Sequence, residues 1–123
     1  MIRAHAAFAL GAALLCAPSA NAQTGGLQVS PVIIDIPAAR GLSSFRLRNR
    51  RDHEAAFEID VFAWSQANGE NVLTPSADLI VAPSVFLVRA GVEQIVRLGV
   101  APPARGGNVE LSYRIVVREL PTG

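Results

Sequence analysis

Leu111-Ser112-Tyr113-Arg114-Ile115-Val116-Val117-Arg118-Glu119-Leu120-Pro121 is the stretch that decides the fold class of this chain. Its apolar side chains recur at every second position from Leu111 to Val117, and arginines lie between them. A period of two predicts a β-strand that lies on an apolar core, and Pro121 ends it because proline lacks a backbone donor. We expect a neighbouring strand on each side. Only two residues follow Pro121, so a neighbour from downstream is not supplied by this chain.

The rest of the sequence is also strand-like. Apolar and β-branched stretches are separated by turn residues at intervals of about 8–12 residues, and no segment has a helical period. These stretches are Leu27–Ile36, Leu42–Asn49, Ala55–Trp64, Val72-Leu73, Leu79–Val88 and Val92–Val100. Six or seven short strands in about 100 residues predict an all-β, immunoglobulin-like β-sandwich. Its final strand is expected to be missing.

Proline and glycine mark the breaks in this pattern. Pro31 lies within the first stretch and predicts an edge strand or a strand with a break, and Pro83 interrupts the stretch Leu79–Val88. Asn68-Gly69 is the strongest hairpin signal in the chain. Phe62 and Trp64 lie on the otherwise polar face of their strand, so we expect a covered end or an apolar patch there.

The N-terminus has the features of a secretory signal. Arg3 provides a positive start, residues 6–17 form an apolar run, and Ala20-Asn21-Ala22 is a small-x-small cleavage site before Gln23. The apolar run is too short to span a bilayer, which requires about 20 residues. Residues 1–22 are therefore expected to be a cleaved signal peptide and 23–123 the domain. The single cysteine, Cys16, leaves with the signal, so the domain has no disulfide.

Charge and composition exclude several classes of function. The 11 basic residues are all arginine and are balanced by 10 acidic residues, which argues against a nucleic-acid partner and a polybasic membrane anchor. No membrane insertion is expected after cleavage. We expect a binding module and no enzyme, with no catalytic residue, cofactor or metal site.

Three weaker site candidates favour a structural interpretation. His53 lies in a charged turn and is expected to be solvated. Glu58 and Asp60 are expected to face arginines of a neighbouring strand rather than to act as an acid–base pair. Four arginines could form an anion-binding stripe, although an exposed strand face is the simpler interpretation: Arg46, Arg48, Arg50 and Arg51.

From Leu27 to Pro121 the chain resembles the first domain of the periplasmic chaperones of chaperone–usher pili, in particular those that accompany spore-coat-U-like pilins. The resemblance rests on five segments: Leu27–Pro31, Val61–Trp64 with Asn68-Gly69, Val81–Phe86, Ala90–Arg97 and Tyr113–Pro121. It implies a periplasmic chaperone that caps pilin subunits by donor-strand complementation and delivers them to an outer-membrane usher. It implies no nucleotide or metal.

The resemblance also implies partner-binding positions, which are Pro31, Val32, Ile33, Arg97, Arg114 and Glu119. The sequence departs from the family pattern at its two carboxylate anchors. Pro31 stands where the family has an arginine, and the chain contains no lysine, which the family carries in its donor strand after Glu-Leu-Pro. Glu119 matches a family glutamate that pairs the two domains. Trp64 and Tyr113 could serve in core packing as well as in binding, and Tyr113 could be the corner tyrosine of the sandwich.

Three interpretations of the whole chain remain open at this point. The first is part of a pilus chaperone whose second domain is absent from this sequence. The second is a pilin-like strand acceptor, whose missing strand comes from a partner. The third is a self-sufficient secreted immunoglobulin-like interaction module.

Overall fold

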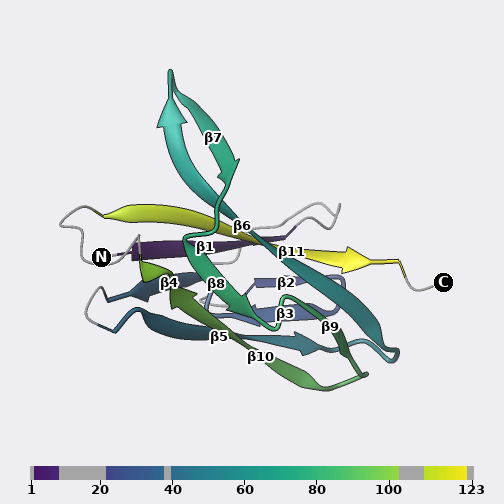
Figure 1. Ribbon diagram of the computed structural model, residues 1–123. Coiled ribbons are helices and arrows are strands. Elements are labelled where there is room, and N and C mark those ends of the chain that lie inside the picture. Colours follow the sequence, from purple (N-terminus) through teal and green to yellow (C-terminus); the bar gives the residue numbers. More distant parts are fainter. Residues whose placement is uncertain (1, 9–21, 38–39, 103–109, 122–123) are drawn as a thin grey trace.

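The computed structural model describes residues 2–8, 22–37, 40–102 and 110–121, and these form two β-sheets packed face to face (Figure 1). The predicted all-β, immunoglobulin-like sandwich is confirmed. No helix among the described residues is long and apolar enough to cross a membrane. The strands are β1 (Ile2–Phe8), β2 (Ala22–Thr24), β3 (Leu27–Ser30), β4 (Ile33–Ile36), β5 (Leu42–Asn49), β6 (Ala55–Ala67), β7 (Glu70–Pro75), β8 (Leu79–Ala82), β9 (Val85–Val88), β10 (Glu93–Val100) and β11 (Leu111–Leu120).

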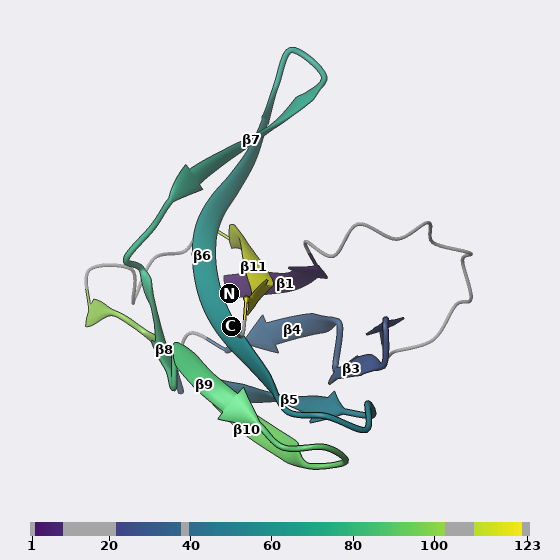
Figure 2. The same ribbon diagram turned by 90° about the vertical axis from the view of Figure 1, so that its right-hand side faces the viewer.

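One sheet has six strands and the other has five. One sheet has the order β4-β1-β11-β6-β7, with β9 also paired to β6, and the other has the order β2-β3-β5-β10-β8. Figure 2 shows the sheets as separate layers, with β11 and β6 in one and β5 and β10 in the other. We call them the β11 sheet and the β5 sheet.

Two prolines mark the places where the chain changes sheet. The predicted break at Pro31 separates β3, which pairs with β5, from β4, which pairs with β1. Pro83 likewise separates β8, which pairs with β10, from β9, which pairs with β6. Both prolines follow a cis peptide bond. Because proline cannot donate to a ladder, each ladder ends there and the next strand can join the opposite sheet.

The core lies between the sheets and follows the predicted alternation. Phe45 and Leu47 of β5 are fully buried, as are Ile115 and Val117 of β11. Tyr113 is also buried, and its hydroxyl donates a hydrogen bond to the Asp78 carboxylate at 2.7 Å. A corner tyrosine would donate to a backbone carbonyl instead. Tyr113 is therefore a core residue with a side-chain partner.

The Asn68-Gly69 prediction is confirmed. Both residues have positive φ, at 54° and 79°, between the paired Ala67 and Glu70. Two consecutive positive φ values give the turn type whose twist matches that of the flanking strands. The β6–β7 hairpin extends well beyond the sandwich (Figure 1).

The strand beside β11 corrects one prediction. β11 pairs antiparallel with β6 on one side and parallel with β1 on the other, from Ile2↔Leu111 to Phe8↔Val117. The position expected to be empty is thus filled by Ile2–Phe8, part of the expected signal peptide. Periodicity missed this strand because three of its seven residues, Ala4, Ala6 and Ala7, are alanine, which is a strong helix former and is depleted in strands. The remaining signal features, including Cys16 and most of the cleavage site, lie outside the described residues.

Candidate partner-binding surface

The register of the β11 sheet places four side chains in one row on its outer side. His5 of β1 pairs with Ile33 of β4 and with Arg114 of β11, and Arg114 pairs with Phe62 of β6. Successive residues of a strand alternate between faces, so paired residues share a face. Trp64, two residues after Phe62, lies on the same side. We call these five residues, Ile33, His5, Phe62, Trp64 and Arg114, the Trp64 surface.

Aromatic contacts hold the centre of this surface. The Arg114 guanidinium lies 5.1 Å from the centroid of the Trp64 ring, and the His5 ring meets the same indole edge-on, with centroids 5.2 Å apart. The indole Nε1 donates to Asn71 Oδ1 of β7 at 3.1 Å. A cation over an indole face is attracted by the ring quadrupole. Trp64 is therefore oriented from three sides while it remains half-buried.

His5 is the least satisfied polar group on the surface. Its Nε2 is buried without a hydrogen-bond partner among the described residues. Desolvation by burial lowers the pKa of His5, and the neighbouring Arg3 and Arg114 charges lower it further, while Asp35 opposes the shift. The imidazole is therefore biased toward its neutral form, which is the form that packs against an indole without an unpaired charge.

Three of the predicted partner-binding residues follow one another where the chain crosses between the sheets: Pro31 and Val32 lie at the rim of the Trp64 surface, and Ile33 belongs to it. Pro31 is exposed, and Val32 is half-buried, with its carbonyl accepting a hydrogen bond from the Ala6 backbone N–H at 3.1 Å. The Ile33 side chain is 55% exposed on the edge strand β4. The structure thus brings Val32, Ile33 and Arg114 together through β1, which lies between β4 and β11.

Glu119 lies at the opposite end of β11 and has a partner within the chain. The Arg51 guanidinium donates to Glu119 Oε1 at 2.5 Å, and its Nε donates to the Gly25 carbonyl at 2.5 Å. Glu119 therefore has a partner within this chain, Arg51, which the resemblance did not imply. This ion pair ties the end of β11 to the turn after β5 and to the β2–β3 connection.

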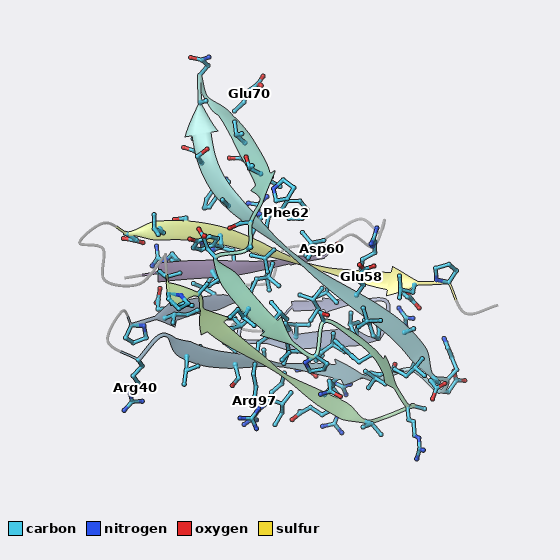
Figure 3. All side chains as sticks on the ribbon, in the orientation of Figure 1. Arg40, Glu58, Asp60, Phe62, Glu70 and Arg97 are labelled. Atoms are coloured by element: carbon cyan, nitrogen blue, oxygen red, sulfur yellow. The ribbon has the colours of Figure 1, made fainter. Side chains whose placement is uncertain are left out.

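Arg97 belongs to the other side of the molecule. It lies on β10 in the β5 sheet and points away from the β11 sheet (Figure 3). No carboxylate of the described residues forms an ion pair with it. Its surroundings include the exposed side chains of Leu42, Ile80 and Ile95. Arg97 and Arg114 therefore lie on different sheets of the sandwich.

The weaker candidates have structural partners. Arg118 of β11 donates to Glu58 at 2.5 Å and lies 3.7 Å from Asp60, which confirms strand-surface ion pairs. Figure 3 shows both carboxylates along the outer side of β6. His53 is exposed beside Asp52, as expected for a turn residue, and its hydrogen bond lowers the pKa of that carboxyl.

The arginine stripe divides between different contacts. Arg46 approaches Glu93 at 3.8 Å, Arg50 donates to Gln28 at 3.4 Å, and Arg51 turns to Glu119. The arginines therefore do not form a continuous anion-binding row, because Arg46 and Arg51 already face the carboxylates of Glu93 and Glu119. No group of three or more metal-ligating side chains is present within the part of the chain that the structure describes.

One hollow adjoins the Trp64 surface and was not predicted. It opens between β6 and β8, where the two sheets part, and Phe62 forms part of its wall. Apolar side chains dominate the lining, and Asp60, Ser76 and Ser84 are its polar members. The sequence signal for it was the apolar pair Phe62 and Trp64 on a polar strand face.

The comparisons with known proteins identify the domain. A family model described as "Pili and flagellar-assembly chaperone, PapD N-terminal domain" matches residues 26–123. The comparison with curated proteins gave no match.

Among solved structures, a chain of the CsuC–CsuE chaperone–tip adhesion subunit pre-assembly complex, from the archaic chaperone–usher Csu pili of Acinetobacter baumannii, is 27% identical with a TM-score of 0.56. The match covers 66% of this chain and 37% of that chain. The periplasmic chaperone SfaE is 12% identical with a TM-score of 0.46, over 68% of this chain and 51% of that one. The chain thus spans well under two thirds of the length of these matched chains.

Proposed function

Because the chain belongs to the family of pili and flagellar-assembly chaperones, through its PapD-type N-terminal domain, we propose that it is a periplasmic chaperone of pilus subunits. It would cap subunits by donor-strand complementation and pass them to an outer-membrane usher. The observation that carries the proposal is the family match over residues 26–123. The similarity to a chain of a chaperone–adhesion subunit complex supports a subunit as the partner.

The proposed chemistry is non-covalent. A subunit that lacks one strand exposes an apolar groove and an unpaired edge, which promotes aggregation. A strand lent along that edge adds backbone hydrogen bonds and places alternate apolar side chains in the groove. Burying four such side chains stabilises the complex by about 8 kcal/mol, at roughly 2 kcal/mol each. This is comparable with the stability of a small domain, so the function requires no catalysis or cofactor.

We place the capping interface along β11 and the part of the Trp64 surface that remains once residues 1–22 are removed, which is Ile33, Phe62, Trp64 and Arg114. Ile33 offers exposed apolar area at the sheet edge, and Arg114 offers a cation held in place by Trp64. Pro31 and Val32 lie at the rim of the same surface. Arg97, on the opposite sheet, and Glu119, paired with Arg51, are outside the proposed capping interface.

Residues 1–22 would direct export and be removed, which places the domain in the periplasm. The positive start at Arg3 and the small-x-small site at Ala20–Ala22 support this. Mass spectrometry of the exported domain should give an N-terminus at Gln23. A mature protein that begins at Met1 would contradict the assignment.

Co-expression tests the chaperone activity. The chain is exported together with a pilin subunit of the same genome that lacks its own final strand, and the soluble periplasmic subunit is measured with and without it. We expect the subunit to become soluble and to co-elute with the chain in size-exclusion chromatography. A subunit that aggregates equally in both cases would contradict the proposed function.

Two matched variants locate the interface. Ile33→Asp alters the edge of the β11 sheet, and Ile80→Asp alters an equally exposed position on the β5 sheet, at 55% and 58% exposure. We expect the first to reduce capture of the subunit at least tenfold, which corresponds to about 1.4 kcal/mol, and the second to leave it unchanged. Equal effects of both variants would reject this placement while leaving the chaperone activity itself intact.

A further inference from the structure

We propose that the outer face of the β5 sheet binds an extended segment of a partner protein that carries an acidic side chain between two apolar ones at alternate positions. This face belongs to the other sheet from the proposed capping interface, so the inference does not depend on the proposed chaperone function. It gives a partner to Arg97, which lies outside the capping interface.

The register of the β5 sheet sets the order of side chains on this face. Gly99 of β10 pairs with Leu42 of β5 on one side and with Ile80 of β8 on the other, so the three share a face. Arg97 lies two residues earlier on β10 and points outward (Figure 3), and Ile95 lies two residues before Arg97. Outward side chains of one strand follow each other at about 7 Å. The face therefore presents an apolar row, a cation and a second apolar side chain in equal steps.

The apolar side chains around Arg97 are open to solvent. Leu42, Ile80 and Ile95 are 65%, 58% and 45% exposed. They line two adjoining hollows, which share Leu42 and Arg97. Apolar side chains that are exposed next to one another indicate an interaction site, whereas singly scattered ones do not.

Gly99 leaves a notch in the middle of the apolar row. Glycine inside a strand has no side chain to pack and lowers the stability of the strand. Among the described residues, an added Cβ would meet only Leu42 Cδ2, at an ordinary 3.7 Å, so crowding does not require glycine here. Glycine inside a strand often marks a place that a ligand or another chain approaches closely. The notch between Leu42 and Ile80 therefore receives an apolar side chain of the partner.

The charge of this face selects an acidic partner. The strands of the β5 sheet carry three arginines and one carboxylate, which are Arg46, Arg48, Arg97 and Glu93. Glu93 approaches Arg46 at 3.8 Å, whereas no carboxylate of the described residues pairs with Arg97. A partner that covers the apolar side chains also shields the Arg97 guanidinium from water, which strengthens its bond with a carboxylate. The acidic side chain therefore lies over Arg97, between the two apolar ones.

A synthetic peptide tests the pattern directly. The probe is a short capped peptide in which leucine, glutamate and leucine alternate with threonine, and its binding to the full chain is measured by NMR titration and calorimetry. We expect saturable binding that weakens as salt is added and that weakens at least tenfold when glutamine replaces the glutamate. No saturable binding up to about 1 mM peptide, or equal binding of the two peptides, would overturn the proposal.

Matched variants locate the site on the chain. Arg97→Gln removes the cation, and Arg89→Gln removes the same charge in the turn between β9 and β10. Gly99→Val fills the notch with a β-branched side chain, which suits a strand. We expect Arg97→Gln and Gly99→Val to weaken peptide binding at least tenfold and Arg89→Gln to leave it unchanged. Equal effects of the two arginine variants, or full binding by Gly99→Val, would overturn the proposal.

A second pair of variants keeps the test valid if Gly99→Val does not fold, and it separates this site from the capping interface. Ile80 and Ile33 are similarly exposed on the two sheets, at 58% and 55%. We expect Ile80→Asp to weaken peptide binding at least tenfold and Ile33→Asp to leave it unchanged, which is the reverse of their effects on subunit capture. Peptide binding that is lost in Ile33→Asp and kept in Ile80→Asp would overturn the proposal and leave the chaperone activity intact.

Two other occupants of this face are tested in parallel. Phosphatidylcholine vesicles with and without phosphatidylglycerol test an anionic membrane surface, and sedimentation of the chain alone tests a second copy. We expect the chain neither to bind the vesicles nor to self-associate through this face. Vesicle binding or self-association that Gly99→Val abolishes and the peptide does not displace would overturn the assignment of an extended segment as the occupant.

Discussion

Asn49 gives the sharpest test of how the sandwich holds the end of β11. Asn49 is the buried polar residue of the described core, and its side chain makes three hydrogen bonds. Its Nδ2 donates to the Val88 and His53 carbonyls at 3.0 and 2.8 Å, and its Oδ1 accepts from the Arg51 N–H at 3.0 Å. Arg51 in turn holds Glu119, so Asn49 positions the residue that anchors β11.

Asn49→Ala removes all three bonds and leaves the Val88 carbonyl buried without its side-chain donor. At about 1 kcal/mol net for each bond, we expect a loss of about 3 kcal/mol in the free energy of unfolding. For a domain of this size, that corresponds to a fall in Tm of about 12 to 24 °C. The measurement is urea and thermal unfolding of the full chain, followed by circular dichroism.

Asn71→Ala is the matched control. The Asn71 side chain also accepts two hydrogen bonds, from Trp64 and Gln66, but it lies on the exposed β7. We expect it to cost less than about 0.5 kcal/mol, as is usual for surface substitutions. If Asn49→Ala costs no more than Asn71→Ala, buried hydrogen bonding at Asn49 is not what fixes this end of the sandwich.

Three further predictions concern β11, the long hairpin and His5. Glu119→Gln weakens the partly buried contact with Arg51 and should lower the free energy of unfolding by about 1 kcal/mol. Glu70→Gln, at the exposed tip of the hairpin, is the control and should leave the stability unchanged. Equal losses of stability in urea unfolding would reject the role of the ion pair. Gly69→Ala should lower the free energy of unfolding by about 1 kcal/mol because alanine is strained at the φ of 79°, and not because of a clash, since no atom lies within 4 Å of an added Cβ. A variant as stable as the unaltered chain would reject the positive φ at this position. The pKa of His5 is lowered in the folded chain, so the contribution of His5 to stability is complete above the unfolded pKa of about 6.5 and is lost as the pH falls from there toward the folded pKa. His5→Gln should remove this part of the pH dependence of unfolding in the uncleaved chain. An unchanged pH profile of unfolding would contradict the prediction.

Sequence reasoning predicted most of the fold because strand periodicity and turn chemistry are local. The alternation in Leu42–Asn49 and Leu111–Leu120 identified the buried faces, and Asn68-Gly69 located the long hairpin. Pro31 predicted a break for the correct reason, a missing donor. The local signal could not show that the chain changes sheets at this break, because sheet membership depends on partners distant in sequence.

The candidate site was only partly predictable for the same reason. Ile33 and Arg114 were named from the resemblance, but their proximity depends on β1, which lies between them. Trp64 was noticed as an apolar residue on a polar face, yet its contacts with His5 and Arg114 require three strands in register. Arg97 could not be assigned to the opposite sheet without knowing the strand order.

The sequence by itself determined the class of fold, the alternation of buried side chains and the places where strands end, because each depends on residues adjacent along the chain. Tertiary structure decided which strands are neighbours. It gave Glu119 a partner in Arg51, placed Arg97 and Arg114 on different sheets, and put Ile2–Phe8 beside β11. Those outcomes depend on how distant segments share one core, and alanine-rich residues 2–8 carry no periodic signal strong enough to reveal it.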